Sequence, residues 1–104
     1  MDKAHQDDIL QFIRRLSRAI RENRIYLVYR KKNRDTMAKL ELTIQNVLNE
    51  LKGLQLQHYL GGPEPDRDCE GTIWKFEKKI KGLIVHIKVN ERENGNWACI
   101  SFHE

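Results

Sequence analysis

Lysine and histidine side chains recur in the last third of the chain, at Lys75, His86, Lys88 and His103. An imidazole can take or give a proton near neutral pH, and ammonium groups stabilise negative charge on phosphoryl oxygens. Together these groups suit metal-free cleavage of RNA, in which a base deprotonates the 2′-hydroxyl and an acid protonates the leaving 5′-oxygen. The simpler alternative is that they only keep an exposed surface hydrated.

Strand alternation predicts that these four side chains share one face of a sheet, because every second residue of a strand points the same way. The segment 72–104 predicts three antiparallel strands with turns at 81–82 and 93–96, and the Asn-Gly pair in the second turn is a hairpin signal. The face predicted to form the core carries Trp74, Phe76, Leu83, Val85, Ile87, Val89, Ala98, Ile100 and Phe102. The opposite face is predicted to carry Lys75, Glu77, Lys79, His86, Lys88, Ser101 and His103.

Two segments have the apolar spacing of helices. From Asp7 to about Glu22, apolar residues form one stripe and arginines occupy other positions. A second helix is predicted to start with Thr43 as its N-cap and to end near Gly53. In the last predicted strand, Trp97 has the parity of the polar face. We expect it to cover the end of the sheet; the alternative is that it stacks on a base.

The remaining segments complete an α+β arrangement. Residues 25–29 predict a strand, and polar residues at 33–35 predict a helix start before 36–40. The segment 61–71, rich in glycine, proline and acids, predicts a loop. We therefore expect one domain over residues 1–104, with two layers. The sheet would be mainly antiparallel, one strand plus a three-strand C-terminal meander, with helices packed on one face.

The charge of the chain allows nucleic-acid binding without requiring it. Nineteen basic residues stand against 15 acidic ones, giving a net charge of +4 and a pI of about 9.2. Basic residues crowd the first helix and the segment after the first strand. We assign phosphate positioning to Arg30, Arg34, Lys78 and Lys79, and the alternative is that these runs form only a solvated surface.

The sequence carries no membrane or export signal that we can identify. No apolar run approaches the roughly 18 residues of a transmembrane helix, and residues 1–12 lack the apolar region of a secretory signal. Cys69 and Cys99 do not have the spacing of a metal site, so we expect free thiols and no metal or other cofactor. A cytoplasmic protein without a membrane partner is the prediction.

Five segments of the chain resemble the MqsR family of toxins from type II toxin–antitoxin systems, a branch of the RelE-like ribonuclease superfamily. They are NRDTMAKLELT at 33–43, GPEPDRD at 62–68, IWKFEKKI at 73–80, VHIKV at 85–89 and CISFHE at 99–104. Together with the first helix they cover nearly the whole chain, in the order found in the family. The resemblance implies a RelE-like fold, a sheet with helices on one face.

The resemblance also implies a function. It suggests a metal-independent endoribonuclease that cleaves messenger RNA, free or ribosome-bound, and that is silenced by a cognate antitoxin protein. It implies an active face with Lys75, His86, Lys88 and His103, the residues that strand alternation also selects. His86 stands where the family usually carries tyrosine. The alternative is a non-catalytic RNA- or protein-binding module of the same fold.

Overall fold

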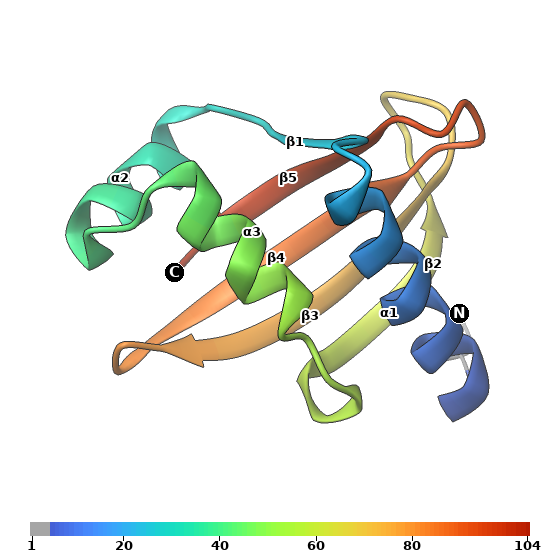
Figure 1. The fold of residues 1–104 in the computed structure, drawn as a ribbon, viewed down its shortest axis with the longest axis horizontal. Helices are drawn as coiled ribbons and strands as arrows, with labels where there is room; N and C mark the ends of the chain where they lie inside the picture. Colours follow the sequence, from blue (N-terminus) through green and yellow to red (C-terminus); the bar gives the residue numbers. More distant parts are fainter. Residues whose placement is uncertain (1–4) are drawn as a thin grey trace.

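A five-stranded mixed sheet with helices against one face forms the fold (Figure 1). The computed structural model describes residues 5–104; residues 1–4, part of the segment searched for an export signal, lie outside it. In chain order the elements are α1 (Gln6–Arg21), β1 (Ile25–Leu27), α2 (Lys31–Leu40), α3 (Ile44–Lys52), a 3-10 turn (Leu56–His58), β2 (Tyr59–Pro65), β3 (Thr72–Ile80), β4 (Leu83–Glu91) and β5 (Trp97–His103). The result is an α+β protein of two layers.

The sheet order is β1-β5-β4-β3-β2. The β3–β4–β5 meander is antiparallel as predicted, and β1 joins it by pairing in parallel with β5. Figure 1 shows α1 and α3 crossing in front of the sheet and α2 beside the C-terminal end of β5. Within the described residues, no helix has the length and apolar character needed to cross a membrane.

The two predicted helices form as expected. The apolar stripe of α1 is buried, and Asp7 and Asp8 lie in its first turn, where they complement the positive end of the helix dipole. The helix α3 starts at a capping box. The Oγ1 atom of Thr43 accepts from the backbone N–H of Asn46 at 3.1 Å, and the Asn46 side chain accepts from the Thr43 N–H at 2.9 Å. This confirms Thr43 as the N-cap.

The start of α2 differs from the prediction. The helix begins at Lys31 after an extended Arg30, so it includes residues 33–35, which were expected to precede it. Asn33 does not serve as a cap because its side chain is fully buried and bonds to the backbone of neighbouring segments.

Strand β2 corrects the first part of the predicted loop, residues 61–65, while residues 66–71 form a loop as predicted. The number of strands rises from four to five. Strand β2 pairs irregularly with β3, with two shifts of register, at the edge of the sheet. Glycine and proline are tolerated there because an edge strand needs few ladder donors and often carries bulges. At Gly62, with φ of +101°, an added Cβ would lie 2.5 Å from the Ile73 carbonyl oxygen. Close approach of the two strands therefore explains a composition that suggested a loop.

A bulge in β5 corrects the predicted faces of that strand. Lys88 pairs with Ser101 and Val89 with Cys99, so Ile100 is the extra residue. One extra residue reverses the face of the sheet to which each earlier side chain of the strand points. Trp97 and Cys99 thus join the core. Ala98 and Ile100 were predicted in the core. Ala98 is buried, but on the opposite face, next to Asn90, and Ile100 is half-buried; neither belongs to the core cluster.

Aromatic rings of the core fix the helix layer to the sheet. The ring of Phe12 in α1 stacks on Trp74 at 4.3 Å between centroids, on Trp97 at 5.5 Å and on Phe76 at 5.7 Å. Such contacts add to the free energy gained by burying these large side chains. Because the aromatic side chains lie between the sheet and the helices, the opposite face of the sheet is free to carry polar groups.

Gly71 is expected to be essential for stability. Its φ is +96°, and an added Cβ would lie 2.2 Å from the Glu91 carbonyl oxygen. We expect Gly71→Ala to lower the free energy of unfolding by about 2–4 kcal/mol, measured by urea denaturation. Gly82→Ala is the matched control, since Gly82 has a φ of +85° but open space around the added atom. Equal losses in the two variants would show that the close contact does not contribute.

Candidate functional site

One face of the sheet, which we call the open face, is not covered by the helices. It brings together the four residues selected from the sequence, Lys75, His86, Lys88 and His103. In the strand register Lys75 lies opposite Lys88, and His86 lies opposite His103. Directly opposed side chains have Cβ atoms about 5 Å apart. Each of the four is exposed or half-buried. Their predicted placement on one face is confirmed, while their chemical roles stay predictions.

His103 has a neighbour that determines which nitrogen carries its proton. Its Nε2 atom lies 3.5 Å from the Nη2 of Arg30, and its Nδ1 lies 3.0 Å from the Glu104 carbonyl oxygen. A guanidinium only donates, so Nε2 faces it with its lone pair and Nδ1 donates to the carbonyl. Arg30 is itself held by a 2.6 Å bond to the Ser101 hydroxyl. In this arrangement the neutral ring of His103 carries its lone pair at Nε2, where it faces the Arg30 guanidinium.

His86 lies against a carboxylate instead. Its Nδ1 atom is 3.5 Å from the Oε2 of Glu77, which lies directly opposite on β3. A carboxylate only accepts, so this contact orients the ring with a proton on Nδ1 and forms an ion pair when the ring is protonated. The other ring nitrogen is then free to act on a ligand. The two histidines therefore face partners of opposite charge.

A cleft of about 460 Å³ opens beside the histidines and holds the two lysines. It lies between the open face and the loop that follows β2. Its lining residues are Arg30, Glu64, Pro65, Asp66, Arg67, Asp68, Ile73, Lys75, Lys88, Ile100 and Ser101. Lys75 forms a 3.0 Å ion pair with Glu64, whereas Lys88 is exposed. The histidines do not line the cleft and lie next to it on β4 and β5.

The wall of the cleft is held in place by a buried amide. Asn90, fully buried, donates to the Asp66 carboxylate at 2.8 Å and to the Glu70 carbonyl at 3.2 Å. Its own oxygen accepts from Arg92 at 2.6 Å. The Asp66 carboxylate also accepts from the backbone N–H groups of Asp68 and Cys69. These bonds order the acidic loop, residues 66–71 between β2 and β3, beside Lys75 and Lys88.

The four residues assigned to phosphate positioning have different environments. Arg30 lines the cleft, and Lys79 is exposed on the open face opposite Ile84. Arg34 lies in α2 with its guanidinium 5.5 Å from the centre of the Tyr29 ring. Lys78 corrects the prediction of an exposed cation.

Lys78 has the parity of the core residues, and its side chain is only 16% exposed. It forms a 2.9 Å ion pair with the Glu50 carboxylate and donates to the Glu50 carbonyl at 3.0 Å. Both contacts lie at the C-terminal end of α3, where a cation stabilises the helix dipole. Lys78 therefore fixes a helix and is not available on the open face.

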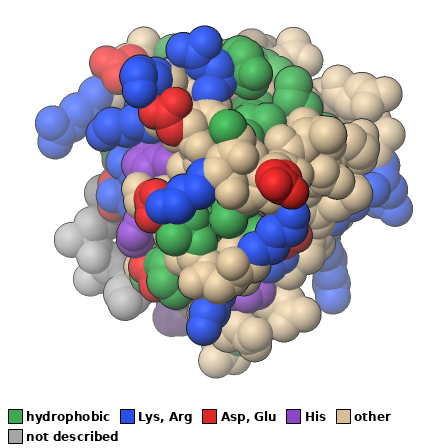
Figure 2. Space-filling model, turned by 90° about the vertical axis from the view of Figure 1, so that its left-hand side faces the viewer, with side chains coloured by type: hydrophobic (Ala, Val, Ile, Leu, Met, Phe, Trp, Pro, Cys, Tyr) green, Lys and Arg blue, Asp and Glu red, His purple; other side chains and the backbone are tan. Residues whose placement is uncertain are grey.

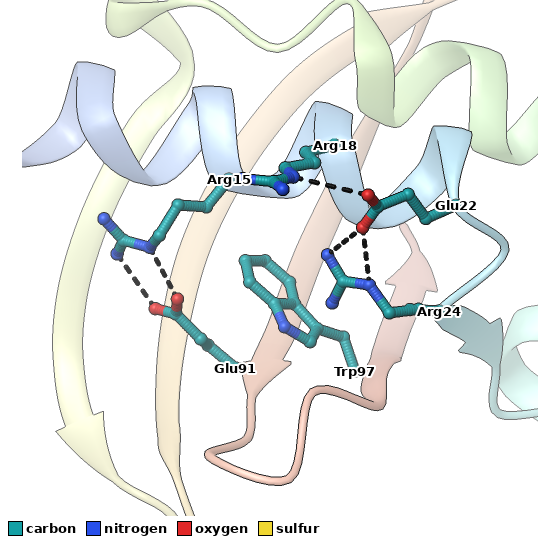
Figure 3. Close-up of a pocket in the computed structure, with 6 residues that line it drawn as sticks. All are labelled: Arg15, Arg18, Glu22, Arg24, Glu91 and Trp97. Atoms are coloured by element: carbon teal, nitrogen blue, oxygen red, sulfur yellow. Dashed lines mark hydrogen bonds and ion pairs between the residues drawn. The ribbon is translucent and has the colours of Figure 1, made fainter.

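A second cavity, of about 270 Å³, lies between α1 and the sheet (Figure 3). Arg15 donates to Glu91 at 2.6 and 3.0 Å, a hydrogen bond that raises the pKa of Arg15. On the other side of the cavity Glu22 lies between Arg18 and Arg24, as Figure 3 shows. These bonds, the one from Arg24 first, lower the pKa of Glu22. Because its charged groups are paired with one another, this cavity is a weaker candidate for a ligand site.

Trp97 forms the floor of that second cavity and corrects a further prediction. It was expected on the face of His103, but it is only 4% exposed and belongs to the core. Cys99 is buried beside it, and burial raises the pKa of its thiol to about 12. Cys69 is exposed. No group of three or more metal-binding side chains gathers within residues 5–104.

Sequence reasoning missed the groups that surround the predicted residues. The contact between Arg30 and His103 joins residues far apart in the chain, and no local pattern predicts it. Glu77 was placed on this face by its parity, but its contact with His86 was not predicted. In the space-filling view, lysine, arginine and histidine side chains lie side by side on part of the surface (Figure 2). On the open face itself, the strand register places acid–base groups beside cations.

Comparison with known proteins adds no family assignment. No protein-family model matches the chain, and no curated protein matches its sequence. The resemblance to the MqsR family thus stays a prediction, and the geometry of the open face has to be weighed on its own.

Proposed function

We propose that the protein is an endoribonuclease of the MqsR type, with a RelE-like fold, that cleaves messenger RNA without a metal and is neutralised by a cognate antitoxin. The observation that carries the proposal is the direct opposition of His86 and His103 on the open face, beside Lys88 and Lys75. Two imidazoles in register with adjacent cations provide a base, an acid and charge stabilisation within one site.

The environments of the histidines suggest which is the base. The neutral ring of His103 has its lone pair at Nε2, which faces Arg30 in the free protein. When the 2′-hydroxyl replaces Arg30 as the partner of this nitrogen, His103 takes its proton as the 2′-oxygen bonds to phosphorus. His86, next to Glu77, gives its proton to the 5′-oxygen as the bond between that oxygen and phosphorus breaks. The products are a 2′,3′-cyclic phosphate and a new 5′-hydroxyl, and each histidine ends in the protonation state in which the other began.

The cations act on the charge that builds between these two proton transfers. Lys88 and Arg30 both line the cleft next to the histidines, where they stabilise the non-bridging oxygens of the phosphate. Lys75 forms an ion pair with Glu64, so its positive charge is partly neutralised within the protein. We therefore expect Lys88 to contribute more to the rate than Lys75.

A non-catalytic binding module is the second candidate. It is favoured by the acidic partners of the site, because Glu64 pairs with Lys75 and Glu77 faces His86. In this case the open face binds RNA or a protein and the histidines only add hydrogen bonds.

The test is incubation of the purified full chain with single-stranded RNA in EDTA. We expect fragments from the parent protein and a cleavage rate about 10²–10³-fold lower for Lys88→Ala, because a cation at the reacting phosphate is lost. Lys52→Ala, which removes the same charge from an exposed site on α3, is the matched control and should cleave normally.

The outcomes separate the two candidates. Full activity of Lys88→Ala, with circular dichroism showing an intact fold, would exclude the proposed site. Salt-sensitive RNA binding by the parent without any cleavage product would select the binding module instead. Arrest of bacterial growth on expression, relieved by the protein encoded in the adjacent gene, would support the toxin–antitoxin assignment.

A further inference from the structure

We propose that Tyr26 and Arg92 form a stacking subsite for one unpaired base, so that the open face takes single-stranded rather than double-stranded RNA. This inference rests on the proposed function and specifies its substrate. The subsite lies beyond the cleft, at the end of the open face away from the histidines.

The position of Tyr26 follows from the strand register. Tyr26 pairs with Ala98, and Ala98 pairs with Asn90, so its ring lies on the open face above a small side chain. Its neighbours Ile25 and Leu27 are buried in the core on the other side of the sheet. Half of Tyr26 is exposed, although the ring is large and apolar. A tyrosine in this place has an accessible ring surface on the same face as the proposed catalytic groups.

Arg92 is fixed next to that ring. Its guanidinium lies 5.8 Å from the centre of the Tyr26 ring, and its Nε donates to the Asn90 side chain at 2.6 Å. The hydrogen bond with the Tyr26 side chain raises the pKa of Arg92. Because Asn90 is buried and also holds the acidic loop, Arg92 is tied to the rigid part of the sheet. The subsite is therefore preorganised before any ligand arrives.

A flat ring beside a fixed cation matches the chemistry of one nucleotide. The ring of a base stacks on the tyrosine while its phosphate pairs with the guanidinium. Bases in a duplex have both faces covered by their neighbours, so only an unpaired base can use the ring. The subsite therefore favours single strands over duplexes and does not select one base by hydrogen bonding.

By the strand register, the cleft residues Lys88 and Ser101 lie between the histidines and Ala98, next to the subsite. Ile73 and Ile100 line the cleft with Lys75 and Lys88, which gives apolar and cationic contacts between the two ends. Along β5 the distance from Ala98 to His103 is roughly 15 Å at the usual rise per residue. A strand of a few nucleotides could span it, with one base on Tyr26 and the reacting phosphate at His86 and His103.

The experiment uses the full chain and a short 2′-O-methyl RNA, which the proposed reaction cannot cleave. The probe contains 2-aminopurine, whose fluorescence falls when it stacks. We expect Tyr26→Ala to weaken binding of the single strand about 5–100-fold and to abolish the quenching, and Tyr26→Phe to retain both. The duplex form of the probe should bind equally well to the parent and to Tyr26→Ala.

Two further variants test whether a loss of binding comes from misfolding or from the removal of any exposed apolar side chain. Tyr26→Leu keeps an apolar side chain in β1 but has no aromatic face, so it should behave like Tyr26→Ala. Leu10→Ala removes a comparably exposed side chain from α1 and should bind normally. If the parent binds the single strand and the Tyr26 variants bind it with the same affinity and quenching, the subsite is wrong while the proposed function stands. If the parent binds no RNA, the proposed function fails and the subsite with it.

Discussion

Replacing His103 with alanine is expected to lower the single-turnover rate of RNA cleavage by about 10²–10⁴-fold, the usual contribution of a positioned general base. The substitution removes the nitrogen that would accept the proton of the 2′-hydroxyl. It should leave the fold intact, because the imidazole is only half-buried on the open face and does not belong to the hydrophobic core. His86→Ala is expected to reduce the rate by a similar factor, through loss of the acid.

A double variant and a control sharpen this prediction. If the two histidines act in one step, the fold-loss in rate of the double variant His86→Ala, His103→Ala should be much smaller than the product of the fold-losses of the two single variants. His5→Ala removes an exposed histidine at the start of α1, away from the sheet, and should cleave at the parental rate. A cleavage rate of His103→Ala within a few-fold of the parent would show that the opposed imidazoles do not perform the chemistry.

Asn33→Asp is expected to lower the free energy of unfolding by about 3–5 kcal/mol, a large part of the roughly 5–15 kcal/mol that holds a domain of this kind. Asn33 is fully buried. Its amide nitrogen donates to the carbonyls of Val28 and Ile100, at 2.7 and 3.0 Å, and its oxygen accepts from the Phe102 N–H at 2.9 Å. A carboxylate would place a negative charge against two carbonyl oxygens.

Urea denaturation provides the measurement. Asn49→Asp is the matched control, since Asn49 is exposed on α3 and its side-chain oxygen accepts from Gln45. An acceptor is kept there, so we expect a change within about 0.5 kcal/mol. A loss in Asn33→Asp no larger than in the control would mean that the buried bonds do not stabilise the fold.

Asn33 also explains why the open face depends on a residue in a helix. Its bonds hold the bulged segment of β5 around Ile100, and this bulge sets which side of the sheet Ser101 and His103 occupy. The side chain therefore joins α2, the end of β1 and the bulge. Loss of activity in Asn33→Asp should follow the loss of folded protein.

Strict alternation made the centre of the sheet predictable from the sequence. In β3 and β4 the residues Lys75, His86 and Lys88 each lie between two apolar residues, so their faces follow from parity alone. His103 was also placed correctly because it lies after the bulge. Ala98, before the bulge, was assigned to the wrong face, since nothing in the local pattern shows an extra residue.

The remaining errors have the same physical origin, contacts between distant segments. Strand β2 was missed because glycine and proline disfavour a strand until β3 supplies a neighbour close enough to require glycine. Lys78 was treated as a surface cation, although the end of α3 folds over it. Likewise, only the folded chain brings Arg30 to His103 and Arg92 to Tyr26.

The ends of the RNA fragments provide the most direct measurement of the central claim, that opposed imidazoles on the open face promote attack by the 2′-hydroxyl. A defined single-stranded RNA is digested by the parent protein in EDTA and the fragment masses are determined. The account predicts 2′,3′-cyclic phosphates and 5′-hydroxyls from the parent and intact RNA after the same time with the variant that lacks both histidines. Fragments with 5′-phosphates and 3′-hydroxyls, or equal cleavage by the double variant, would contradict it.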